Sequence, residues 1–250
     1  MATSSLPDSN HFWLFGYGSL IWKPPPHFGQ SDYRLPVRRK FLLTRADKRV
    51  PGYIEGYVRR FWQASSEDHR GTPEAPGRVV TLIERSFWAT LDDPQRDSEG
   101  TKVWGVAYHI PPDRVVEVKE YLDIREINGY SIQYTTFQPA DKGLAPIDCL
   151  VYIGMPDNPQ FLGALQPQDV AATINESIGP SGENSDYLLQ LEAALESLSP
   201  DSGDEHVSDL ARRLRLLATP TRSLRQRRAS AAGLQRVSST EEQEEIEKEV

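Results

Sequence analysis

The chain has 250 residues, and 28 Lys and Arg against 36 Asp and Glu set its formal charge at −8 at pH 7. This length allows one large domain or two small ones with a substantial core. The acidic balance disfavours nucleic-acid binding, and no apolar run approaches the roughly 18 residues of a membrane span, so we expect neither partner. Residues 1–10 lack the basic and apolar regions of a secretory signal. The single cysteine, Cys149, cannot form an internal disulfide, so we expect a cytoplasmic protein.

The charge is distributed unevenly along the chain. Residues 218–250 carry five Arg and one Lys against six Glu, so this segment is neutral and the whole −8 belongs to residues 1–217. So polar a segment cannot bury enough apolar surface to offset its ordering entropy. We therefore predict a flexible N-terminus over 1–10, one folded domain over 11–217 and a disordered tail over 218–250. Ser230, which follows two arginines and an alanine, is a candidate kinase site, although such strings also arise by chance in Arg- and Ser-rich tails.

The sequence of the first half of the folded domain predicts strands separated by polar loops. An apolar run at its start ends in a tight turn at Gly16 and Gly18, and later runs are rich in β-branched and aromatic residues. The predicted strands are Trp13–Tyr17, Tyr53–Gln63, Val79–Glu84 and Val103–Ile110. The predicted loops are 23–51, Arg70–Gly77 and Asp92–Gly100.

Helices dominate the second half. Pro111-Pro112-Asp113 favours a helix start and Asn128-Gly129 favours a left-handed stop, which predicts a helix between them. Two strands are then predicted at Ser131–Phe137 and Cys149–Ile153, and three helices at Asp169–Ser177, Ser185–Leu198 and Asp204–Leu217. Strands with one inserted helix, followed by consecutive helices, indicate an α+β fold rather than alternating α/β.

The glycine-rich turn at 15–20 is the first candidate site. A buried strand that ends in two glycines can present consecutive backbone N–H groups to an anion. The dinucleotide pattern fails because Ile21 stands where its third glycine belongs, and neither a Walker motif nor a Gly-x-Ser-x-Gly elbow is present. Considered alone, the segment fits a simple tight turn better than an anion site.

Glu126 is the second candidate. It falls in the last turn of the helix predicted to end at Asn128-Gly129, where the negative helix end raises the pKa of an unpaired carboxylate. Such a group suits a general base working near neutral pH. The alternative is a solvated glutamate paired with Arg125 or Lys119, which describes most glutamates.

The remaining candidates point to no metal chemistry. Segment 179–187 connects two predicted helices, and Asn184 or Ser185 can cap the second, so a capped loop explains it alone. The five His are scattered without metal-ligand spacing, and there is only one Cys. We therefore expect no metal and no other cofactor.

Taken in order, nine segments of residues 12–217 resemble the glutathione-specific gamma-glutamylcyclotransferase family, the ChaC-like proteins. The segments are 17–22 (YGSLIW), 57–63 (YVRRFWQ), 68–73 (DHRGTP), 76–82 (PGRVVTL), 103–108 (VWGVAY), 121–126 (YLDIRE), 152–154 (YIG), 157–159 (DNP) and 179–182 (GPSG). The resemblance implies a small closed β-barrel with helices packed outside. It also implies a lyase that releases 5-oxoproline and L-cysteinylglycine from glutathione, with no cofactor.

The resemblance also assigns residues to roles. The family's catalytic glutamate corresponds to Glu126, and its loop for the γ-glutamyl group corresponds to Tyr17, Gly18, Ser19 and Leu20. Arg59, Arg60 and Tyr130 are further candidates for the charged ends of the substrate. In this chain Ile127-Asn128 precedes Gly129-Tyr130 where the family usually has a second glycine, and an asparagine can keep that turn.

Two other functions stay open on the sequence. The first is a cyclotransferase for another γ-glutamyl amino acid or amine. The segments around Arg59 and His69 argue against it, because they resemble the glutathione-specific members. The second is a non-catalytic binding module, against which the retention of Glu126 argues. Residues 28–51 and 86–100 look like insertions that can reshape the mouth of the site.

Overall fold

The computed structural model describes residues 12–25, 49–65, 70–98, 100–118 and 130–217. The predictions for Glu126, for Ser230, for the N-terminus over 1–10 and for the tail over 218–250 lie outside the described residues. For Tyr130 only the backbone is described.

Five strands form a closed barrel. They are β1 (Phe12–Gly16), β2 (Arg49–Glu55), β5 (Lys102–Ile110), β6 (Tyr130–Pro139) and β7 (Ile147–Gly154). Their order around the barrel is β1-β5-β2-β6-β7, and a parallel pairing of Leu14 with Leu150 joins β1 to β7. The closed barrel with helices outside it is therefore confirmed. Closure leaves fewer strand edges open to pairing with other chains.

Paired glycines make room for aromatic side chains inside the barrel. Gly52 of β2 stands directly opposite Gly105 of β5. A Cβ at Gly52 would lie 2.4 Å from the Phe137 ring, and one at Gly105 would lie 2.7 Å from the Phe15 ring. The two rings, both buried, lie 5.6 Å apart between their centroids. The narrow barrel is thus filled by alternating very small and very large residues.

The chain leaves the barrel at Gly56 and enters a second, two-stranded sheet. The sequence predicted one strand over Tyr53–Gln63, and this is wrong, because the structure has two, β2 and β3 (Tyr57–Ser65). Gly56 between them has φ of 85°, a conformation that ends the straight run. Beyond it, β3 leaves the barrel and pairs with β4 (Gly77–Glu84).

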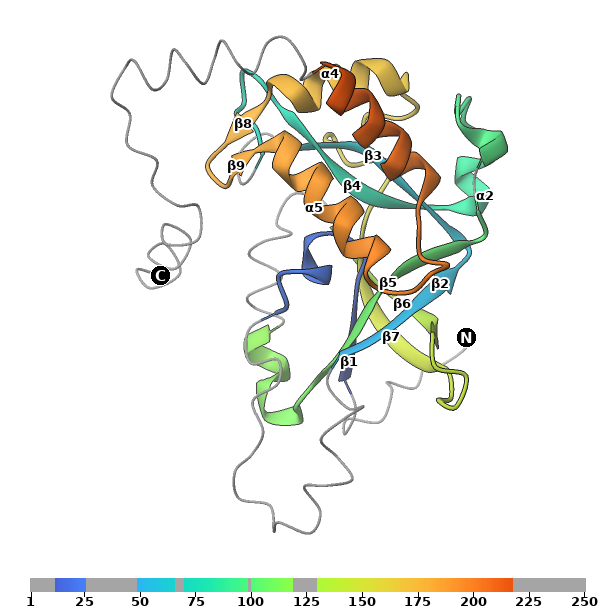
Figure 1. Ribbon diagram of the computed structural model, residues 1–250. Helices are drawn as coiled ribbons and strands as arrows, with labels where there is room; N and C mark the ends of the chain where they lie inside the picture. Colours follow the sequence, from blue (N-terminus) through green and yellow to red (C-terminus); the bar gives the residue numbers. More distant parts are fainter. Residues whose placement is uncertain (1–11, 26–48, 66–69, 99, 119–129, 218–250) are drawn as a thin grey trace.

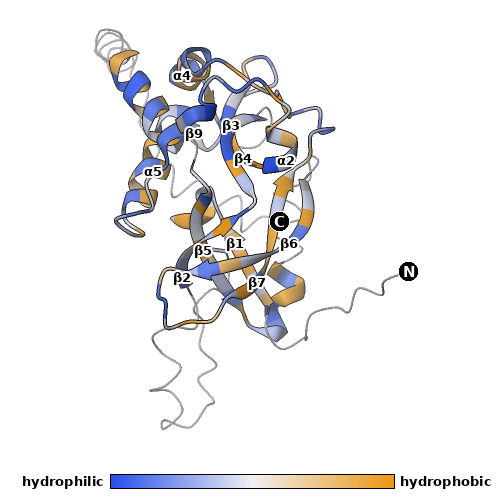
Figure 2. Ribbon diagram, turned by 90° about the vertical axis from the view of Figure 1, so that its right-hand side faces the viewer, coloured by the Kyte–Doolittle hydropathy of each residue, from blue (hydrophilic) through white to orange (hydrophobic). Residues whose placement is uncertain are grey.

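Helices cover the β3–β4 sheet. Figure 1 shows α4 (Pro167–Glu176) and α5 (Asn184–Glu196) gathered beside this sheet, with the barrel below them. Residues 205–217 are also helical, and all three helices were predicted to within two residues at each end. Figure 2 shows hydrophobic residues along the barrel strands and a mixture of hydrophobic and hydrophilic residues along α5, as an amphipathic helix requires.

Shorter elements complete the described chain. They are η1 (Ser19–Ile21), α2 (Arg85–Trp88), η2 (Arg96–Ser98), η3 (Pro112–Arg114), β8 (Ile178–Gly179) and β9 (Gly182–Glu183). None of the described helices combines the length and the apolarity that a membrane crossing requires.

Candidate active site

The chain turns back sharply where β1 ends, and we call residues 17–20 of this turn the donor loop. A Cβ at Gly16 would lie 2.5 Å from the Cβ of Leu20, closer than real Cβ atoms approach one another. Only glycine therefore lets the chain leave β1 and enter η1 in so short a distance. The turn predicted at Gly16 and Gly18 is confirmed, and it places the donor loop at one end of the barrel.

Backbone hydrogen bonds fix the first carbonyl groups of the turn. The Gly18 carbonyl accepts a hydrogen bond from the Ile21 N–H at 3.0 Å. The Ser19 carbonyl accepts two, from the N–H groups of Trp22 at 3.1 Å and Lys23 at 2.8 Å. Both peptide planes are therefore held in one orientation.

Side chains from the barrel fix the next two carbonyls. The Tyr108 hydroxyl on β5 donates to the Leu20 carbonyl at 2.6 Å, and the Arg49 guanidinium on β2 donates to the Ile21 carbonyl at 3.2 Å. Arg49 and Tyr108 are direct partners across the two strands. Burial raises the pKa of Tyr108, and Arg49 opposes this shift, so the phenol stays protonated and remains a donor near neutral pH.

As a consequence, the N–H groups of Ser19 and Leu20 point away from the bonds that their preceding carbonyls accept. In a trans peptide the N–H of one residue is opposed to the carbonyl of the residue before it. In the described part of the chain, no atom accepts a hydrogen bond from the N–H groups of Gly18, Ser19 or Leu20. Consecutive oriented donors of this kind attract an anion. The arrangement can hold a carboxylate or a developing oxyanion.

A tyrosine from α5 supports the donor loop from the side of the second sheet. A Cβ at Gly18 would lie 3.2 Å from the Tyr187 hydroxyl oxygen and 3.0 Å from a methyl carbon of Val80 on β4. The Tyr187 ring also lies 5.6 Å from the Trp22 ring and 5.8 Å from the Phe61 ring. The loop is thus packed against residues of β4 and α5, where there is little room for a side chain at position 18.

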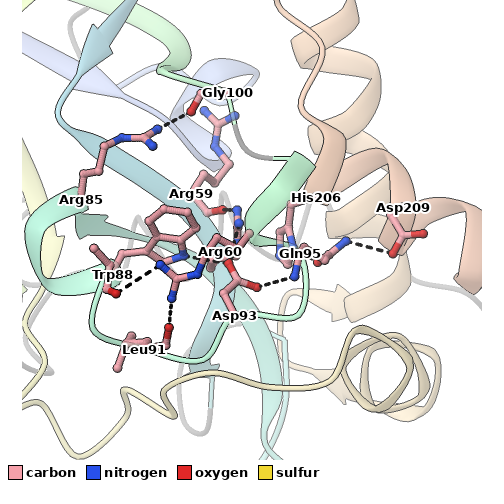
Figure 3. Close-up of polar contacts among 12 residues, drawn as sticks. Arg59, Arg60, Arg85, Trp88, Leu91, Asp93, Gln95, Gly100, His206 and Asp209 are labelled. Atoms are coloured by element: carbon pink, nitrogen blue, oxygen red, sulfur yellow. Dashed lines mark hydrogen bonds and ion pairs between the residues drawn. The ribbon is translucent and has the colours of Figure 1, made fainter.

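Arg59, which the sequence suggested for a charged end of the substrate, has its guanidinium engaged elsewhere. Its side chain is 1% exposed, and it donates to the Asp204 carboxylate at 2.9 Å and to the Trp104 carbonyl. Figure 3 shows it beside Arg60. The contacts of Arg59 join β3 to β5 and to the start of the final helix.

The neighbouring charges form a second buried group around Asp93. The Asp93 carboxylate accepts hydrogen bonds from Arg60 at 2.8 Å and from the Trp88 indole at 2.7 Å (Figure 3). Both Arg60 and Asp93 are buried, so this ion pair is desolvated and depends on its hydrogen bonds. It fixes the 92–98 segment against the outer side of β3.

His206 lies next to these arginines and is neutral. Its Nε2 accepts the Phe61 N–H at 3.0 Å, and its Nδ1 lies 2.6 Å from the side-chain oxygen of Gln95, which defines a tautomer protonated at Nδ1. Full burial lowers the pKa of His206 well below its ordinary value, and the charges of Arg60 and Arg59 lower it further. His206 therefore serves β3 as a hydrogen-bond acceptor.

The other predicted residues are placed as follows. The Tyr17 side chain is buried, whereas Ser19 and Leu20 are partly exposed, and the Ser19 hydroxyl has no hydrogen-bond partner among the described residues. The Tyr130 backbone pairs with Gly154 at the start of β6. A Cβ at Gly154 would lie 2.8 Å from the Thr81 hydroxyl, so this end of β6 and β7 lies beside β4, the strand that also packs against the donor loop.

A cavity of about 480 Å³ lies elsewhere in the molecule. It is bounded by residues 94–97, the start of α4 and the final helix, and amide and charged side chains line most of it. No residue of the donor loop lines it, so this cavity does not mark the predicted site. Among the described residues there is no cluster of three His, Cys, Asp or Glu side chains that could hold a metal ion.

Three residues that support the site were not predicted individually: Tyr108, Tyr187 and Arg70, whose guanidinium lies over the Tyr187 ring. Tyr108 and Arg70 lie in the family segments 103–108 and 68–73, and Tyr187 follows segment 179–182 by five positions. The family segments in or near which they lie are the signal in the sequence that points to these residues. Their roles depend on partners about 90 to 170 residues away in the sequence, which no local pattern shows.

The chain is similar to known proteins along most of its length. The family model described as ChaC-like protein matches residues 12–216. The glutathione-specific gamma-glutamylcyclotransferase of Schizosaccharomyces pombe is 39% identical over 220 residues, which cover 87% of this chain and 99% of that protein. The human glutathione-specific gamma-glutamylcyclotransferase 1 is 36% identical over 203 residues, which cover 80% of this chain and 77% of that protein.

A solved structure shows the same fold. The selenomethionine-labelled gamma-glutamyl cyclotransferase specific to glutathione from yeast matches with a TM-score of 0.65 and 32% identity, covering 82% of this chain and 96% of that one. The matched family model and the relatives above span the barrel, the second sheet and the helices that cover it. The chain therefore belongs to the ChaC-like protein family.

Proposed function

We propose that this protein cleaves glutathione by intramolecular cyclisation of the γ-glutamyl group and releases 5-oxoproline and L-cysteinylglycine. The observation that carries the proposal is the donor loop, where fixed carbonyls orient the N–H groups of Ser19 and Leu20, and these have no acceptor in the described part of the chain. The names of the fungal and human relatives support glutathione as the substrate.

The chemistry needs positioning more than it needs a strong nucleophile. The α-amino nitrogen of the γ-glutamyl unit attacks its own side-chain amide carbonyl, a new C–N bond closes the five-membered ring, and the original amide C–N bond breaks. The departing amine takes up a proton and leaves as cysteinylglycine. Holding the amine over the carbonyl supplies the entropic part of the catalysis, and no covalent enzyme intermediate is required.

In this proposal the donor loop holds the γ-glutamyl end of the substrate. The N–H groups of Gly18, Ser19 and Leu20 would bind the α-carboxylate, with the developing oxyanion as the alternative ligand. Either ligand is an anion bound in a domain of net negative charge, so local hydrogen-bond donors must offset the repulsion. Because the guanidinium of Arg59 is bound to Asp204 and Trp104, we assign it to the support of β3 rather than to the substrate.

Glu126 is the proposed general base and acid. It would take a proton from the α-ammonium and then deliver one to the departing amine. Its place in the sequence supports this role, because Tyr130, four residues later, begins β6 beside β4. Tyr130 stays a weaker candidate for a charged end of the substrate.

The test is turnover by the purified full chain. Glutathione should give 5-oxoproline and cysteinylglycine in equal amounts, measured by mass spectrometry. Turnover of γ-glutamyl-alanine without turnover of glutathione would favour the alternative, a cyclotransferase for another γ-glutamyl compound. No product from either substrate would reject both and favour a binding module.

A substitution tests the assignment of Glu126. Glu126→Gln keeps the shape of the side chain and removes its basic group, so we expect kcat to fall by about a hundredfold or more. Glu176→Gln, an equal change at the end of α4, should leave kcat unchanged. Near-normal kcat in Glu126→Gln would contradict the assignment.

Two cellular predictions accompany the proposal. They are a cytoplasmic location and phosphorylation of Ser230, which cell fractionation and mass spectrometry of the protein from cells would test.

A further inference from the structure

One buried side chain lies beside both ends of the turn that carries the donor loop. The Tyr187 hydroxyl lies 3.2 Å from where a Cβ of Gly18 would be, and its ring centroid lies 5.6 Å from that of Trp22. Gly18 opens the turn and Trp22 closes it. A shift of Tyr187 would therefore move both ends of the segment whose N–H groups form the donor loop.

Tyr187 is in turn held by a buried arginine. The Arg70 guanidinium carbon lies 5.8 Å from the centroid of the Tyr187 ring, and Arg70 donates to the Glu183 carbonyl at 2.9 Å. Arg70 is 6% exposed, and within the described residues no carboxylate lies at ion-pair distance from it. Burial lowers the pKa of Arg70, and the nearby Tyr187 and Asp186 partly offset this. A buried cation depends on such contacts with a carbonyl and an aromatic face.

The start of α5 is attached to β4, so Tyr187 has a fixed base. The Asn184 side chain accepts a hydrogen bond from the Arg78 N–H at 2.7 Å and donates to the Arg78 carbonyl at 2.8 Å. Tyr187 lies three residues later on the same helix, hence on the same face. Arg70 and Asn184 together determine where this face presents the tyrosine.

We propose that Arg70 and Tyr187 form a positioning pair that holds the donor loop in the geometry needed to bind the γ-glutamyl group. Neither residue needs to touch the substrate for this role. The expected change in kcat/KM rests on the proposed function. The expected change in hydrogen exchange at the turn does not depend on that function.

The test compares four variants of the full chain at matched folded concentration, verified by circular dichroism below the melting temperature. Arg70→Met removes the cation, Arg70→Lys returns a cation, and Tyr187→Phe removes only the hydroxyl. The matched control is Arg96→Met. Arg96 also lies over an aromatic ring, 4.9 Å from the centroid of Trp88, and donates to a main-chain carbonyl, but it belongs to the 92–98 segment.

Two readouts are measured. The first is kcat/KM for glutathione, which we expect to fall about tenfold or more in Arg70→Met, to recover in part in Arg70→Lys and to fall less in Tyr187→Phe. The second is amide hydrogen exchange at Ile21, Trp22 and Lys23, whose N–H groups close the turn. Exchange there should quicken in Arg70→Met and stay unchanged in Arg96→Met.

The outcomes separate this inference from the proposed function. If the wild type does not cleave glutathione, the proposed function fails, while faster exchange at the turn in Arg70→Met alone would still support the positioning pair. The inference is overturned if exchange at the turn is unchanged in Arg70→Met and kcat/KM stays within twofold. It is also overturned if Arg96→Met produces the same two effects, since they would then reflect general loss of stability.

Discussion

The Tyr108 hydroxyl is a single group that anchors the end of the donor loop. In Tyr108→Phe the carbonyl of Leu20, the last residue of the loop, loses a partly buried hydrogen bond of 2.6 Å, so this end of the loop is held less firmly. We expect the free energy of unfolding to fall by about 1 kcal/mol, the usual cost of one buried hydrogen bond. We also expect KM for glutathione to rise several-fold with little change in kcat, because a bound α-carboxylate keeps its charge through the reaction.

Steady-state kinetics and urea unfolding measure these effects. Tyr134→Phe is the matched control, since that side chain is 52% exposed and lies on the outside of β6. A fall in kcat at constant KM would assign the donor-loop N–H groups to the oxyanion instead, and no kinetic change at all would contradict the role given to Tyr108.

Single residues of the site were predictable from the sequence only where neighbouring residues form a recognisable pattern. The donor loop could be recognised because two glycines and a preceding apolar run lie within a few positions of one another. Arg59 was given a substrate role because a strand arginine in a family segment is compatible with either binding or burial. Its partner Asp204 lies 145 residues away, and only the folded chain brings the two together.

At the scale of elements, Gly56 decides where the barrel ends and the second sheet begins. Its φ of 85° strains any residue with a Cβ, although no atom lies within 4 Å of the place that a Cβ would take. Gly56→Ala should therefore lower the free energy of unfolding by about 1 to 2 kcal/mol, through backbone conformation alone. Urea unfolding measures this.

Gly203 provides the control for this prediction. A Cβ there would also meet open space, but Gly203 is not among the glycines with positive φ, so Gly203→Ala should cost less. Equal losses in the two variants would show that the turn between β2 and β3 does not depend on a left-handed residue.

The long elements were predictable except at this junction, whereas the short α2, η2, β8 and β9 were not predicted and β2 begins at Arg49, inside the predicted loop 23–51. Strands and helices with strong periodicity appeared where expected, because each is determined by its own residues. Residues 53–63 carry β-forming side chains on both sides of Gly56, so the local pattern is continuous while the structure is not. Which sheet each half joins depends on pairing with β5 and β4, and that pairing is a property of the whole fold.

At the scale of the whole molecule, buried polar contacts join the second sheet to the barrel and to the final helix. Arg59 connects β3 with β5 through Trp104 and with the final helix through Asp204. His206, on that helix, accepts the Phe61 N–H of β3, and Phe61 packs against Tyr187. Protonating His206 would remove this acceptor and place a third positive charge beside Arg59 and Arg60.

The stability of the whole chain should therefore fall in mild acid. The folded state holds the pKa of His206 well below the value of about 6.5 expected in the unfolded chain. Below that unfolded value the unfolded chain binds a proton that the folded chain does not, so the free energy of unfolding decreases as the pH falls. The slope approaches about 1.4 kcal/mol per pH unit for one such group, and the contribution is fully present only above pH 6.5 or so.

Urea unfolding of the wild type and of His206→Gln between about pH 7.5 and 5.5 isolates this contribution. The glutamine can still accept the Phe61 N–H but cannot be protonated, so the variant should lose stability more gradually over this range. His109→Gln is the control, because His109 lies on β5 beside Trp13, outside this set of contacts, and the wild-type slope should persist in it. Parallel pH dependence in the wild type and in His206→Gln would show that protonation of His206 is not what lowers the free energy of unfolding in acid.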